Sequence, residues 1–182
     1  NTDWNKEVLL PRAWQQMHSL TASGGSDKVK YFAGFGYVKQ DALYGDTRTN
    51  ESTSGFNRYN ARVNIDANIV DKYLNLSADM AYRQEDRNSI AGSTSDVFNN
   101  MHRNPQTDPG RFPDGNLGKV SLGVNPIGLA TEGGWVKDRK SVLNTRFMLD
   151  FNVPGLEGLN LKGIFSYDKI FNSIKRWTTP VD

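Results

Sequence analysis

The stretch "FNRYNARVNIDANIV", residues 56–70, alternates between apolar and polar side chains with almost no exception. One face carries Tyr59, Ala61, Val63, Ile65, Ala67 and Ile69. The other carries Arg58, Asn60, Arg62, Asn64, Asp66 and Asn68. A period of two predicts a β-strand with one apolar and one polar face. The strand is long, because strands of soluble domains usually run about 5–6 residues.

The same alternation recurs along the chain and predicts an all-β protein, an antiparallel up-and-down meander of about six long strands. The predicted strands cover about 13–23, 29–40, 57–69, 74–84, 141–153 and 159–170. Short connections with turn-forming residues alternate with long ones. The long ones are an initial loop over 1–12 and the segments 41–56 and 84–140. Within the last segment, "SDVFNNMHR" (95–103) predicts a short helix, with Ser95 as its N-cap.

Long strands joined by alternating short and long connections are typical of an outer-membrane β-barrel, whose strands need about 9–11 residues to cross the bilayer. In that interpretation the apolar face meets lipid and the polar face lines a wet lumen. The expected lipid-facing residues are Tyr59, Val63, Ile65, Phe147, Leu149 and Phe165. The expected lumen-facing residues are Arg58, Arg62, Asn64, Asp66, Asp79, Arg83, Arg146, Asp150 and Lys162. A soluble antiparallel sheet with one solvated face shows the same alternation, so this alternative stays open.

The amino-acid composition argues against several classes of function and of structural feature. The 182 residues carry a formal net charge of +2, which gives no strong field for binding nucleic acid. With no cysteine, disulfides and thiolate metal sites are excluded. No apolar run is long enough for a membrane-spanning helix, and "NTDWNKEVLL" does not resemble a signal peptide.

The residues give no catalytic constellation. His18 and His102 lie far apart without metal-ligand spacing, so a zinc site is not expected. The adjacent acids Glu85 and Asp86 border a predicted loop, and a solvated strand end explains them better than acid/base catalysis. We therefore expect no enzymatic activity and no cofactor.

Four motifs carry a resemblance to a known family. "SLTASGGSDKVKYFAGFGYVKQDAL" (19–43) resembles the early barrel of SusC/RagA-type TonB-dependent transporters of Bacteroidetes, and "NTDW" (1–4) the stretch just before it. "FNRYNARVNIDANIVDKYLNLSADMAYR" (56–83) is similar to the next hairpin, and "VPGLEGLNLKGIFSYD" (153–168) to a later one. Each motif is modest alone, and the four occur in the family's order.

The resemblance implies a barrel of about 22 strands in the bacterial outer membrane, filled by an N-terminal plug. It implies import of oligosaccharides or peptides, a SusD-like lipoprotein over the extracellular mouth, and a TonB box that contacts the TonB complex. Nothing in the chain matches the plug or the TonB box, and six strands cannot close such a barrel. We therefore expect a fragment, comprising the second to seventh strands, whose outer strands 13–23 and 159–170 are edges.

Selectivity is expected in the long loop 84–140, because long loops on rigid scaffolds carry binding residues. "DPGRFPDGN" (108–116) and "EGGWVKDR" (132–139) mix aromatic, charged and glycine residues suited to sugar recognition. Trp135, Arg111 and Asp114 are the candidate substrate-binding residues, although packing of the loop is the favoured explanation of such residues. The competing hypothesis is a soluble all-β module that binds carbohydrate through this loop. The sequence does not identify the cargo.

Overall fold

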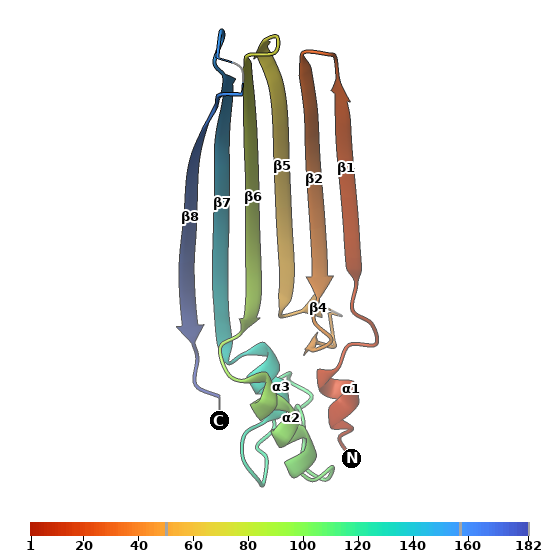
Figure 1. Ribbon diagram of the computed structural model, residues 1–182. Coiled ribbons are helices and arrows are strands. Elements are labelled where there is room, and N and C mark those ends of the chain that lie inside the picture. Colours follow the sequence, from red (N-terminus) through yellow and green to blue (C-terminus); the bar gives the residue numbers. More distant parts are fainter. Residues whose placement is uncertain (50, 157, 182) are drawn as a thin grey trace.

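The computed structural model describes residues 1–49, 51–156 and 158–181, and six long strands form one antiparallel sheet in the order β1-β2-β5-β6-β7-β8 (Figure 1). The strands are β1 (Gln15–Gly25), β2 (Val29–Asp41), β5 (Gly55–Val70), β6 (Leu74–Ile90), β7 (Gly134–Asn152) and β8 (Asn160–Thr178). Two short strands, β3 (Gly45–Asp46) and β4 (Glu51–Ser52), pair within the β2–β5 connection. The predicted up-and-down meander of six strands is confirmed.

The predicted ends of three strands are wrong. β6 continues to Ile90 instead of stopping at residue 84, and β7 begins at Gly134 instead of residue 141. β8 likewise extends to Thr178. The connection between β6 and β7 is therefore 91–133, shorter than the predicted loop 84–140.

Charge complementarity explains the extension of β6 and β7. Apolar alternation stops near residue 84, but backbone pairing continues without a break from Gln84↔Ser141 to Ile90↔Trp135. Three successive pairs in this part set opposite charges directly across from each other. They are Glu85↔Lys140, Asp86↔Arg139 and Arg87↔Asp138. Such pairs stabilise an antiparallel ladder where no apolar face is needed.

Three helices lie beyond one end of the sheet (Figure 1). They are α1 (Trp4–Val8), α2 (Thr94–Arg103) and α3 (Pro126–Thr131). Together with the β2–β5 connection they form what we call the cap, residues 1–12, 42–49, 51–54 and 91–133. The three short turns between long strands lie at the opposite end (Figure 1). The two long connections therefore lie at the same end of the sheet, as strictly alternating antiparallel strands require. The expected plain loop over 1–12 is wrong in part, because it contains α1.

The main hydrophobic core cluster of the described residues lies in the cap and at the adjoining end of β6. It consists of Trp4, Val8, Ile90, Val97, Met101, Ile127 and Ala130. Trp4 is 4% exposed, and its indole Nε1 donates to the carbonyl oxygens of Asn104 at 3.0 Å and Pro105 at 3.2 Å. This indole ties the first residues of the chain to the β6–β7 connection.

Helix α2 confirms the predicted helix over 95–103 with a corrected start. Ser93 is the N-cap, because its Oγ accepts a hydrogen bond from the Ser95 backbone N–H at 3.1 Å. The sequence-based choice of Ser95 is wrong by two residues. Val97 and Met101 are buried, and Phe98 is left partly exposed.

The sheet is a single layer. The helices sit at its end and do not lie across either face (Figure 1). β1 pairs only with β2, and β8 only with β7, so these strands are the two edges, as predicted. Both are exposed along their whole length. In the described part of the chain, no helix is long and apolar enough to cross a membrane.

Candidate functional site

The register places the predicted lipid-facing residues on one face of the sheet. In antiparallel strands, residues directly opposite each other point to the same side. Val63 stands opposite Ala33 and Met80, and Ile65 opposite Tyr31 and Ala78. The register places the rest of the predicted set on the same face: Tyr59, Phe147, Leu149 and Phe165. We call this side the apolar face.

The apolar face ends abruptly toward the cap. On β6 the side chains of this face are apolar from Leu74 to Tyr82, and Gln84, Asp86 and Asn88 follow. A row that includes Tyr37 and Tyr59 marks the change, with ring centroids 5.0 Å apart. Beyond this row the face is mostly polar until the row of Ile90, Trp135 and Trp177 at the cap-side ends of the strands, so the apolar band covers only part of each long strand.

The opposite side, the polar face, carries every predicted lumen-facing residue. The members are Arg58, Arg62, Asn64, Asp66, Asp79, Arg83, Arg146, Asp150 and Lys162. Asp79 is the centre of a network across three strands. It accepts from Arg146 Nη2 at 2.8 Å and Nε at 3.1 Å, and from the Asn64 amide. Arg62 Nε in turn donates to Asn64 Oδ1 at 2.8 Å.

Two further pairs extend the network along the same face. Lys162 Nζ lies 3.5 Å from Asp150 Oδ2, and Asn144 Nδ2 donates to Asp168 Oδ1 at 2.7 Å. A shallow hollow of about 360 Å³ lies between Arg62, Arg146 and Asp168. The carboxylates of Asp79, Asp150 and Asp168 are each held by a cation or an amide. The surface therefore offers hydrogen bonds to a polar solute.

Asp168 and Asn144 belong to the same surface. The period-two alternation of the sequence places both on the polar side of their strands, and the register agrees. Their contact could not be read from the sequence, because it depends on the register between β7 and β8.

The predicted substrate-binding residues do not form one site. The expected loop position of Trp135 is wrong. This residue is paired in β7, between Ile90 and Trp177. Arg111 packs within the cap, donating to the Gly115 carbonyl at 2.9 Å and pairing with Glu132 at 2.9 Å. The packing alternative raised from the sequence describes Arg111 better than sugar recognition does.

Asp114 is also engaged locally. Its carboxylate accepts from the backbone N–H of Asn116 at 3.0 Å and from the Asn116 side-chain amide at 2.8 Å. Such a carboxylate organises a turn. Its two oxygens are thereby occupied by the protein itself.

One ion pair in the cap lowers the pKa of a carboxyl group. Arg48 donates from Nε at 3.0 Å and from Nη2 at 2.8 Å to the carboxylate of Asp46. These hydrogen bonds lower the pKa of Asp46 below its usual value, against an opposing contribution from burial. Asp46 therefore stays ionised in moderately acidic solution.

His, Asp and Glu side chains form no group of three or more able to hold a metal ion within the described ranges. A comparison of the sequence with known protein-family models and with curated proteins finds no match.

Proposed function

We propose that this chain forms part of the wall of a SusC-like TonB-dependent transporter, a barrel of about 22 strands in the bacterial outer membrane. The protein imports an oligosaccharide or peptide without covalent chemistry. The single-layer meander carries this proposal: one face has a continuous apolar band across the strands, and the other has a charged network.

The height of the apolar band supports a lipid-facing role. On β6 it covers residues 74–82, and on β7 the paired residues 143–151. These stretches of about nine residues match the about 9–11 that a tilted strand needs to cross a bilayer. The tyrosine row at its cap-side boundary fits the aromatic girdle found where lipid meets water.

The edges support membership of a larger barrel. β1 and β8 each leave one row of backbone N–H and C=O groups unpaired by the described strands. Hydrocarbon tolerates no such edge, because each unpaired group costs several kcal/mol there. In the proposed barrel, further strands pair both edges and the polar face lines the lumen.

The cap supplies the extracellular side in this proposal. Its position beyond one end of the strands, opposite the short turns, matches the long outer loops of such barrels (Figure 1). A SusD-like lipoprotein would contact this side, where Leu43, Phe112 and Leu122 are exposed. The TonB complex would act through the TonB box that such transporters carry.

The competing function is a soluble all-β module that binds carbohydrate. Its apolar face would need a second layer, and the described residues place their helices beyond the strands. The Arg111 and Asp114 contacts within the cap also leave that module without the binding residues expected for it. We therefore rank it second.

Cysteine labelling tests the proposal, because the chain has no native cysteine. Val63→Cys and Asn64→Cys are made in the complete barrel polypeptide, coupled to a small fluorophore and reconstituted in vesicles with brominated acyl chains. We expect strong quenching at position 63 and little at position 64, its neighbour on the opposite face. A protein that stays in solution without amphiphile, with neither label quenched, contradicts the proposal and favours the soluble module.

A further inference from the structure

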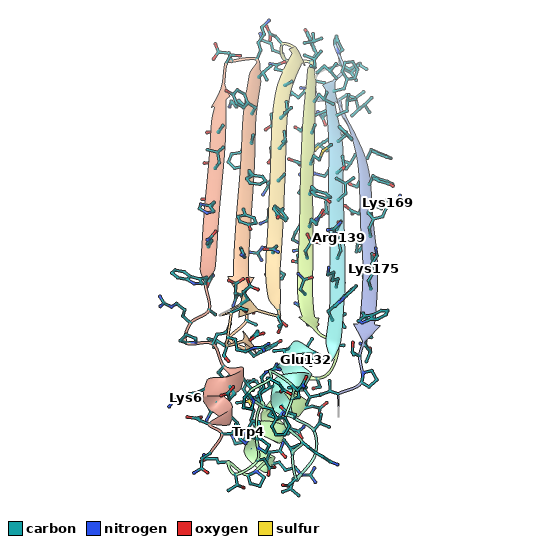
Figure 2. All side chains as sticks on the ribbon, turned by 180° about the vertical axis from the view of Figure 1, so that it is seen from behind. Trp4, Lys6, Glu132, Arg139, Lys169 and Lys175 are labelled. Carbon is teal, nitrogen blue, oxygen red and sulfur yellow. The ribbon has the colours of Figure 1, made fainter. Side chains whose placement is uncertain are left out.

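Basic side chains gather on the apolar face at the cap-side limit of its apolar band and just beyond it, on the two neighbouring strands β7 and β8. We call Lys137, Arg139, Lys169 and Lys175 the cationic patch. Figure 2 shows Arg139, Lys169 and Lys175 along these strands, between their middle and the cap. Lys137 stands directly opposite Lys175 in the register.

This arrangement is unfavourable without a bound anion. Like charges directly opposite each other destabilise a strand pair. In the described ranges, Arg139 has one acidic partner, Asp86, and the three lysines have no carboxylate oxygen within 4.0 Å. All four side chains of the patch are exposed, so a ligand can reach them.

Aromatic rings frame the patch and orient its charges. Lys169 lies at the level of the last apolar row, and its Nζ reaches toward the cap, 4.5 Å from the centroid of the Phe171 ring. This is how a lysine stem runs along an apolar surface while its ammonium stays in a polar layer. On the cap side, Trp135 and Trp177 stand opposite each other. Tryptophan is enriched at the level of lipid headgroups.

We propose that the cationic patch binds the phosphate groups of an anionic membrane lipid whose acyl chains lie on the adjacent apolar band. The inference rests on the proposed function, because it needs this face to meet lipid. A shallow groove of about 410 Å³ provides space for such a headgroup. Lys137, Arg139 and Lys175 border it, and Asp86, which Arg139 neutralises, and Asp138 line it as well. Lipid specificity of this kind follows from charge placed at the membrane surface.

The test compares two double variants with the same change in charge on the same two strands. Lys137→Gln with Lys175→Gln removes two cations from the patch. Lys140→Gln with Arg176→Gln removes two cations from the polar face, since these residues alternate to the other side. Each complete barrel polypeptide is reconstituted in zwitterionic lipid vesicles, and binding is measured for phosphorylated lipid A, dephosphorylated lipid A and inorganic phosphate.

We expect the parent protein and the polar-face variant to bind phosphorylated lipid A equally, and much more strongly than the dephosphorylated form. The patch variant should lose about 25-fold in affinity, at about fivefold for each cation removed. Two results overturn the inference when the protein still enters the vesicles. One is equal affinity of both variants for phosphorylated lipid A, and the other is no preference for the phosphorylated form over the dephosphorylated form. Tight inorganic phosphate binding that the patch variant abolishes identifies a free-anion site and also overturns it. Failure to enter the vesicles at all rejects the proposed function itself.

Discussion

Asp86 and Arg139 lie directly opposite each other on β6 and β7, and Arg139 Nε donates to Asp86 Oδ1 at 2.6 Å. The pair stands where the apolar band has already ended. Gln84 adds a second hydrogen bond to Asp86, at 2.9 Å. The contact therefore replaces apolar packing as the local reason for the two strands to stay together.

A double-mutant cycle of Asp86→Asn and Arg139→Gln tests this contact. We expect a coupling free energy of about 0.2–1 kcal/mol, because the arginine is largely exposed. Raising the salt concentration to about 1 M should remove most of it by screening. The measurement is the free energy of unfolding of the four proteins. A coupling that is zero at low salt contradicts a stabilising role.

The extension of β6 and β7 shows what sequence reasoning missed. The alternation in 56–70 predicts β5 nearly residue by residue, because one apolar and one polar face on the same strand impose a period of two. Past residue 84 that pattern is lost, since both faces are polar there. The signal that remained was charge complementarity between "EDR" (85–87) and "DRK" (138–140), read in antiparallel order.

The cap core was beyond sequence reasoning for a different reason. The hydrogen bond from Trp4 to Asn104 joins residues 100 positions apart in the chain, and no periodicity indicates that contact. The candidate Trp135 was misplaced because its strand was read as loop. Alternation in the sequence is enough to predict which face of the sheet a strand residue occupies. This explains why the predicted lipid-facing and lumen-facing sets fall on separate sides.

Trp4 should hold the cap together. We expect Trp4→Ala to reduce the stability of the cap by about 3–5 kcal/mol, since a large buried ring is removed. Trp4→Phe should cost less, about 1–3 kcal/mol, because it mainly removes the indole donor to two carbonyl groups. Amide hydrogen exchange across 94–131 measures the opening.

Trp14 provides the control for this comparison. It is 61% exposed and precedes β1, outside the cap core. Trp14→Ala should leave exchange across 94–131 unchanged within about 0.5 kcal/mol. Equal effects of the two tryptophans would mean that the cap has no core centred on Trp4.

Gly118 is required by close backbone approach. A Cβ at this position would collide with the carbonyl group of Pro109, while the Gly118 backbone N–H donates to the Gly110 carbonyl at 3.0 Å. Gly118→Ala should therefore destabilise the cap by about 1–3 kcal/mol. Gly92→Ala is the matched control, because a Cβ there meets no atom within 4 Å. It should be neutral or stabilise by up to about 1 kcal/mol. Exchange across 94–131 reports both, and a harmless Gly118→Ala contradicts the close contact.

Acid should weaken the cap through Asp46. Hydrogen bonds from Arg48 lower the pKa of Asp46 in the folded protein, so the ionised form contributes stability at and above the unfolded pKa of about 3.9. That contribution is lost as the pH falls through the lower folded pKa. Asp46→Asn should remove this part of the acid dependence. Arg48→Gln should remove most of it, because the backbone N–H of residue 48 still donates to Asp46 Oδ1 at 3.0 Å. Hydrogen exchange of residues 42–49 followed below pH 5 measures it, and an unchanged profile in both variants disproves the linkage.

The two sides of β5 should respond oppositely to charge. Val63 lies on the apolar face and is 41% exposed, and Asn64 next to it donates to Asp79 on the polar face. In the complete barrel, Val63→Arg should destabilise folding into lipid by about 2–4 kcal/mol if the site lies at the bilayer midplane. Asn64→Arg adds charge to a hydrated wall and should cost much less, although solute transport can change.

Val63→Ala then distinguishes lipid from a packed protein interior. Acyl chains are mobile and fill the space left by two methyl groups, so only a transfer free energy of about 1–2 kcal/mol is lost. Against a second protein layer a cavity contribution is added. Folding into lipid vesicles and partition between detergent and water measure the difference. A protein that folds without any amphiphile and loses well over 2 kcal/mol on this truncation rules out the lipid-facing assignment.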